Sequence, residues 1–77
     1  MSVSKTVREA LTSSGKRQQD LAAFFGSSVQ TMSNKFRLER WTGEELTRVA
    51  AFTGGKLAFV YPDGKQIVFD PPAEEPE

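Results

Sequence analysis

The chain has 77 residues, which is enough for one small domain with a modest hydrophobic core. It contains neither cysteine nor histidine, which excludes disulfide bonds, zinc sites of the usual ligand types and imidazole acid–base catalysis. The formal net charge is zero, but residues 1–69 carry ten basic and six acidic side chains, whereas residues 70–77 carry four acidic side chains and no basic one. We therefore expect a basic body that is not an enzyme, with no catalytic residue, no metal site and no cofactor.

Membrane segments and secretion signals are not recognised in the sequence. The N-terminal residues lack a long apolar run, and nowhere do about eighteen apolar residues follow one another. The expectation is a cytoplasmic protein without a membrane partner, and no small-molecule substrate is evident.

Two helices are predicted in the first third of the chain. The first covers residues 2–14, where apolar residues recur at helical spacing. The second covers residues 17–25 and turns Leu21 inward. Gly15 and Gly26 follow them, and glycine readily adopts the left-handed conformation that ends a helix.

Two more helices are predicted before the chain changes character. A helix over residues 29–36 follows two serines that can cap it, and it turns Met32 and Phe36 inward, which leaves its polar side chains toward solvent. The next helix begins at a capping box formed by Thr42 and Glu45 and ends at paired glycines.

A β-hairpin is predicted over about residues 56–69, because two apolar runs flank the turn sequence PDG. If Tyr61 lies opposite Lys65, both faces of the hairpin are largely apolar. One face is expected to cover the helices. The other is expected to form a homodimer interface through Ala58, Val60, Gln66 and Val68. Alternatively, residues 70–77 cover that face, or its small residues are simply exposed to solvent.

Residues 70–77 read DPPAEEPE and are expected to form a disordered, acidic, proline-rich tail. The chain is thus predicted to be a single domain over residues 1–69 followed by this tail.

The stretch QQDLAAFFGSSVQTMSNKF has the organisation of two helices that cross around a glycine turn. Leu21 and Ala22 are followed by Gly26 and then by Met32, eleven residues after the leucine. This pattern resembles the helix-turn-helix of phage Cro and repressor proteins, the XRE-like family, and the resemblance extends over roughly residues 3–69. It implies a mainly α (α+β) fold, a four-helix lambda-repressor-like domain with a C-terminal hairpin, in which the helix-turn-helix spans about residues 17–37.

The resemblance also implies a function and a set of contact residues. A protein of this kind is a transcriptional regulator, expected here to be a repressor of phage or mobile-element type that binds an inverted repeat in double-stranded DNA as a homodimer. The residues expected at base edges are Ser28, Val29, Gln30, Ser33 and Asn34. The residues expected at phosphates are Lys16, Arg17, Gln18, Thr31, Lys35, Arg37 and Arg40.

The chemistry of these residue types fits the assignment. The amides of Gln30 and Asn34 can bond to adenine N6 and N7, and Val29 can contact a thymine methyl group. The lysines and arginines at the edges of the motif would neutralise phosphates without selecting a sequence. Two positions depart from the family pattern: Ser27 stands where an apolar residue is common, and Arg17 stands where a capping Ser or Thr is common.

Other interpretations of the same residues remain open. The helix pair could be purely structural, the polar face an ordinary solvated surface, and any single cation solvated or paired with a nearby carboxylate. The main alternative function is a protein-interaction module, an adaptor or antitoxin-like partner that uses the hairpin and its edge.

Overall fold

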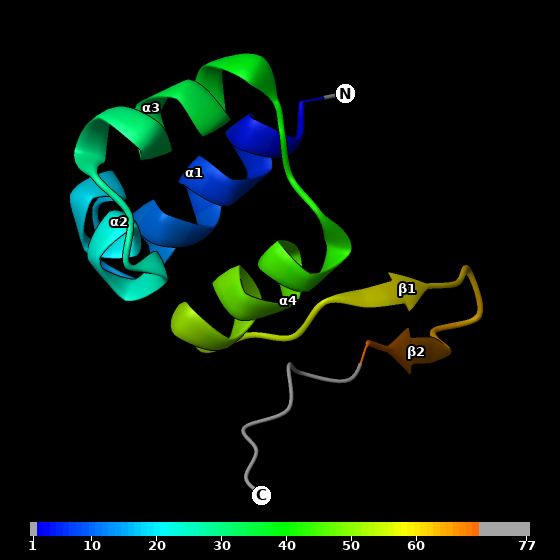
Figure 1. The fold of residues 1–77 in the computed structure, drawn as a ribbon. Helices are drawn as coiled ribbons and strands as arrows, with labels where there is room; N and C mark the ends of the chain where they lie inside the picture. The colour runs from blue at the N-terminus through cyan, green and yellow to red at the C-terminus, as the bar shows by residue number, and fades with distance from the viewer. Residues whose placement is uncertain (1, 70–77) are drawn as a thin grey trace, which may run out of the picture.

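The structure is a computed structural model that describes residues 2–69, and it is mainly helical with a small C-terminal hairpin (Figure 1). Within these residues, the helices are α1 (Val3–Ser13), α2 (Gln18–Phe25), α3 (Val29–Leu38) and α4 (Gly43–Phe52), and the two antiparallel strands are β1 (Ala58–Val60) and β2 (Gln66–Val68). The predicted class of helices followed by a hairpin is confirmed, and the prediction for residues 70–77 lies outside the described residues. No helix in the described part has the length and apolar character needed to cross a membrane.

Side chains at the helix starts satisfy backbone N–H groups that would otherwise lack partners. Ser28 Oγ accepts a backbone hydrogen bond of 3.0 Å from the first turn of α3. Thr42 and Glu45 form the predicted capping box, with reciprocal bonds of 3.1 and 3.0 Å. At α2 the guanidinium of Arg17 cannot accept a bond, so only half of such a box forms: the Asp20 carboxylate accepts from the Arg17 N–H at 2.9 Å.

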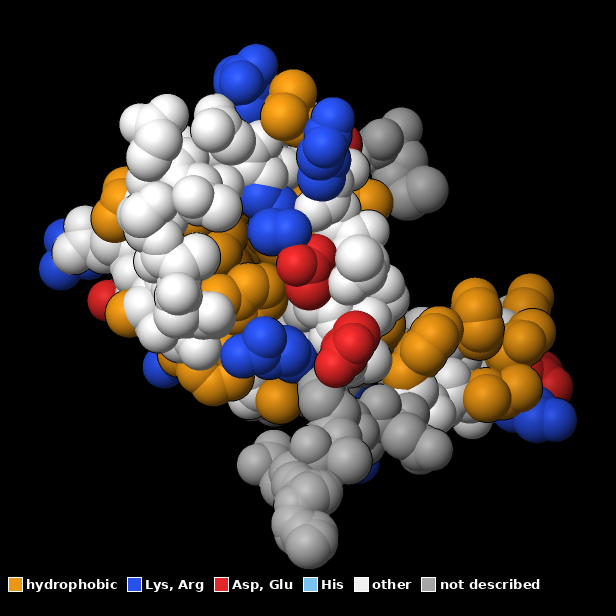
Figure 2. All heavy atoms as spheres, viewed as in Figure 1, with side chains coloured by type: hydrophobic (Ala, Val, Ile, Leu, Met, Phe, Trp, Pro, Cys, Tyr) orange, Lys and Arg blue, Asp and Glu red, His pale blue; other side chains and the backbone are white. Residues whose placement is uncertain are grey.

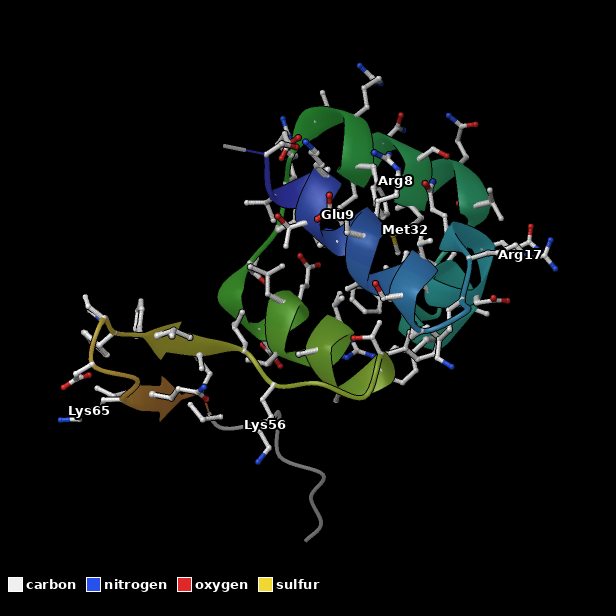
Figure 3. The ribbon with its side chains drawn as sticks, turned by 180° about the vertical axis from the view of Figure 1, so that it is seen from behind. Arg8, Glu9, Arg17, Met32, Lys56 and Lys65 are labelled. Carbon is white, nitrogen blue, oxygen red and sulfur yellow. The ribbon has the colours of Figure 1, made fainter. Side chains whose placement is uncertain are left out.

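The hydrophobic core lies between the four helices. Its buried members are Val7, Leu11, Leu21, Ala22, Met32, Phe36 and Val49. The predicted inward positions Leu21, Met32 and Phe36 are confirmed, and the first two have no exposed surface. Figure 3 shows Met32 within the helical body. Of the two Phe rings at the end of α2, Phe25 is half-buried and Phe24 is exposed.

Ser4 is a buried polar residue in α1 that connects two other parts of the chain. Its hydroxyl donates to the Phe36 carbonyl oxygen at 2.6 Å and accepts from Trp41 Nε1 at 3.0 Å. Both hydrogen-bonding roles of the hydroxyl are therefore used, as a buried polar group requires. These bonds fasten the end of α3 and the following loop to α1.

Glu39 adds a second connection between α3 and α1. It ends α3 in the left-handed conformation with φ 56°, which costs energy for a residue other than glycine. Its carboxylate accepts from Ser4 N at 3.1 Å and from Ser2 Oγ at 2.8 Å. These bonds, the one from Ser4 first, lower the pKa of Glu39 from its ordinary value of 4.5. The end of α3 is thus joined to the start of α1.

The hairpin has the register that the PDG turn predicts. The Tyr61 N–H donates to the Lys65 carbonyl oxygen at 2.9 Å, and Asp63 Oδ1 accepts from the Lys65 N–H at 2.9 Å. Gly64 takes a positive φ of 89° inside the turn. The strand partners are Ala58 with Val68, Phe59 with Ile67, and Val60 with Gln66.

The hairpin projects from the helices instead of covering them (Figure 1). Phe59 is 57% exposed and Ile67 is 50% exposed, so the expectation that their face would cover the helices is wrong. The chain turns back beneath α4, where the Gly55 N–H bonds to the Ala50 carbonyl oxygen at 2.7 Å, and the short strands then extend past the helix. Only the base of the hairpin, including the half-buried Leu57, lines a groove of about 420 Å³ beside α4.

Candidate nucleic-acid interface

The pair α2 and α3 forms the crossing that the sequence predicts. Gly26 ends α2 with φ 71°, and the Ser27 N–H bonds back to the Ala22 carbonyl oxygen at 2.9 Å, which closes the turn. Leu21 and Met32 pack in the core on the inner side of the pair. Ser27 Oγ is buried and has no hydrogen-bond partner among residues 2–69. No hydrogen bond among the described residues therefore explains a serine at this buried place in the turn.

The outer side of α3 gathers the residues expected at base edges. Ser28, Val29, Gln30 and Ser33 are exposed and Asn34 is half-buried. Val29 leaves 57% of its surface exposed at the first position of the helix. Residues 28–34 include no charged side chain, and Figure 2 shows mainly white over this part of the molecule, the colour of the backbone and of side chains that are neither charged nor hydrophobic. The surface can form directed hydrogen bonds without repelling a polyanion.

Three of the five predicted base-contact residues, Ser28, Ser33 and Asn34, already form side-chain hydrogen bonds within the protein. Ser28 Oγ accepts from the Thr31 N–H and also donates to Thr31 Oγ1 at 2.9 Å, so its hydroxyl serves as the cap of α3. Ser33 Oγ accepts from Gln18 Nε2 at 3.1 Å. That bond joins the start of α2 to the middle of α3. It leaves Val29 and Gln30 as the two exposed residues of this surface whose side chains form no such bond in the described part of the chain.

The cations around this surface fall into two groups. Arg17, Arg37 and Arg40 are exposed, and Figure 3 shows Arg17 pointing away from the body. Lys16 is half-buried, with its ammonium 5.1 Å from the centre of the Phe52 ring. The exposed arginines are free to approach a phosphate, whereas Lys16 would have to leave an aromatic contact.

Lys35 is held more firmly than the other predicted phosphate contacts. Its Nζ lies 2.8 Å from Glu45 Oε2 and 3.0 Å from the Arg40 carbonyl oxygen. Burial alone would raise the pKa of Glu45, but hydrogen bonds from Lys35 and the Thr42 N–H, together with the charge of Lys35, lower it from 4.5. Lys35 therefore joins α3 to α4 through its ion pair with Glu45.

The acidic residues among residues 16–40 accept backbone hydrogen bonds at the starts of helices. Residues 16–40 contain five basic side chains and two acidic ones, Asp20 and Glu39. Asp20 bonds to the start of α2, and Glu39 bonds to the start of α1. Neither carboxylate lies among residues 28–34, which contain the cap and the first turns of α3. The segment keeps an excess of positive charge at the margins of a neutral surface.

Arg37 lies within α3, beside Asn34, whereas it was expected at the edge of the motif as a phosphate contact. Its Nη2 donates to Asn34 Oδ1 at 3.3 Å, and its side chain is exposed. Gln30, Asn34 and Arg37 are spaced i, i+4 and i+7, which places them in one line along a helix. This spacing was present in the sequence, but the contact between Asn34 and Arg37 becomes visible only in the structure.

No known protein family, curated protein or solved structure matches this chain. Among residues 2–69, no cluster of three or more metal-ligating side chains is found. The functional assignment therefore depends on the geometry and chemistry of the α2 and α3 surface.

Proposed function

We propose that this chain is a sequence-specific double-stranded DNA-binding regulator that places α3 in the major groove. The observation that carries the proposal is the exposed, uncharged and capped start of α3, bordered by exposed arginines. An α-helix fits the major groove, and polar side chains at its start can reach base edges. The positive end of the helix dipole also lies at this start and favours a polyanion.

The residues of the interface divide by chemistry. Gln30 can bond bidentately to adenine, and the exposed Val29 can contact a thymine methyl group beside it. Arg17 and Arg40 are suited to phosphates, because both are exposed and neither forms an ion pair among the described residues. Lys35 is left out of this set because of its bond to Glu45.

The proposal includes a homodimer that binds an inverted repeat. A domain of this size offers one short reading helix, and a second copy would add a second half-site about one helical turn away. The hairpin provides exposed apolar surface for pairing, with Val60 69% and Val68 42% exposed. The protein would act in the cytoplasm as a repressor of phage or mobile-element type by blocking access of polymerase to the bound site.

Selection of bound sequences from random duplex DNA, at two salt concentrations, tests the proposal. The purified full chain should recover a palindromic site, and its affinity should fall as salt rises. Gln30→Ala should weaken binding to the preferred site by about 1 to 3 kcal/mol and relax the sequence preference at one base pair. Arg17→Ala is the matched control, because loss of a phosphate contact weakens all sequences alike. An unchanged site preference in Gln30→Ala would remove α3 as the reading helix.

The second candidate is a protein-interaction module, and the exposed hairpin is the observation that favours it. Six of its side chains are large, apolar and exposed: Phe59, Val60, Tyr61, Ile67, Val68 and Phe69. Such a surface is typical of a protein-binding site. This candidate predicts no salt-dependent retention of duplex DNA, so the same selection separates the two functions.

A further inference from the structure

Arg37 lies with the residues proposed to read bases and not with those proposed to hold phosphates. Gln30, Asn34 and Arg37 follow one another at i, i+4 and i+7 along α3, and the contact between Asn34 and Arg37 confirms that these two share a face. Arg17 and Arg40, in contrast, come just before α2 and just after α3. The three residues of the line would face the same groove when α3 enters it.

The length of this line matches successive base pairs. A helix rises about 1.5 Å per residue, so Arg37 lies roughly 10 Å further along α3 than Gln30. Base pairs are stacked about 3.4 Å apart, so the two side chains would reach base pairs about three steps apart. An arginine at this position can reach the groove floor, because its side chain is long and exposed.

The state of the guanidinium fits base recognition. It forms no ion pair among residues 2–69, and one of its N–H groups is bound to Asn34 Oδ1. That bond restricts the orientation of the planar group and leaves its other N–H donors available. Two parallel N–H donors match the O6 and N7 acceptors of guanine, which is the commonest specific contact of arginine with DNA.

We propose that Arg37 is a specificity-determining residue that reads a guanine, about three base pairs from the one read by Gln30, while Asn34 orients its guanidinium. The inference rests on the proposed DNA binding by α3. It changes the sequence-based expectation for Arg37, which was a phosphate contact without sequence preference. The preferred half-site would therefore contain one G·C pair that depends on Arg37.

The test uses the full chain and the duplex it prefers after selection from random DNA. At the G·C pair, exchange for another pair should reduce binding of the unaltered protein roughly 5- to 150-fold. Replacing that guanine by 7-deazaguanine, which lacks the N7 acceptor, should also weaken binding. Arg37→Ala should bind all four base pairs at this position alike and should not respond to 7-deazaguanine. Arg17→Ala, the matched control, should keep the full preference for guanine.

The possible outcomes separate this inference from the function on which it rests. If Arg37→Ala weakens every duplex equally and retains the guanine preference, Arg37 holds a phosphate and only this inference is overturned. A selected half-site without a G·C pair at the expected distance would also overturn this inference while leaving the proposed function in place. If the unaltered protein selects no duplex at all, the proposed function and this inference fail together.

Discussion

The helical body and the hairpin use their apolar residues in opposite ways. In the body, Leu21 and Met32 are fully buried and neighbouring helices are joined by the Ser4 and Glu39 bonds. In the hairpin, Phe59 and Val60 leave 57% and 69% of their surfaces exposed. An isolated hairpin is marginally stable in water, and exposed apolar patches commonly mark binding surfaces. The helical body is therefore stabilised by its own core, whereas the hairpin leaves apolar surface for another molecule.

The largest effect is expected in the core of the body. Leu21→Ala removes a fully buried side chain between α2 and the rest of the core, and should lower the free energy of unfolding by about 2 to 5 kcal/mol. Leu38→Ala makes the same chemical change at a residue that is 45% exposed, and it should cost far less. Urea unfolding followed by the fluorescence of Trp41 measures both. Equal losses would contradict the burial of Leu21 and the exposure of Leu38.

A smaller effect is expected at the buried hydroxyl of Ser4. Ser4→Ala should lower the free energy of unfolding by about 1 to 3 kcal/mol, because Trp41 Nε1 and the Phe36 carbonyl oxygen lose their bonds to it. Ser27→Ala is a matched comparison, since Ser27 Oγ is buried without a partner in the described residues. That change should leave stability unaltered or raise it by up to about 1 kcal/mol. Unfolding monitored by circular dichroism decides between these results.

The smallest effect on stability is expected in the hairpin. Val60→Lys places a charge on an exposed residue, so the free energy of unfolding of the helical body should change by less than about 0.5 kcal/mol. If the hairpin joins two copies, sedimentation should shift from dimer to monomer in this variant. A dimer that persists would place the interface elsewhere, and a large loss of stability would contradict the independence of the two regions.

Local signals explain why much of the fold could be predicted. Capping at Ser28, Thr42 and Glu45 involves residues within three positions of one another, and Gly26 ends α2 by its own conformational freedom. The hairpin register follows from the PDG turn in the same way. Inward residues such as Met32 were identified because helical periodicity separates one face from the other.

The candidate site was predicted only in part. The exposure of Gln30 follows from the position of Met32 and Phe36 on the opposite face. Val29 shares the i, i+3, i+7 spacing of these two residues, so its 57% exposure at the first position of α3 does not follow from helical periodicity. Sequence spacing could not show that Lys35 binds Glu45, because this pair joins two different helices. The bonds of Ser33 to Gln18 and of Arg37 to Asn34 were likewise not expected. They change which side chains are free to meet a ligand.

The helices, their caps, the glycine turn between α2 and α3 and the register of the hairpin could be predicted from the amino-acid sequence, because each depends on backbone preferences and periodicity over a few residues. The bonds of Glu39 between α3 and α1, and the exposure of Phe59 and Val60 on the projecting hairpin, were visible only in the folded molecule. These features depend on contacts between residues distant in the chain and on the direction in which the chain continues after α4. A short sequence pattern predicts neither of these features, because both arise from the packing of the whole domain.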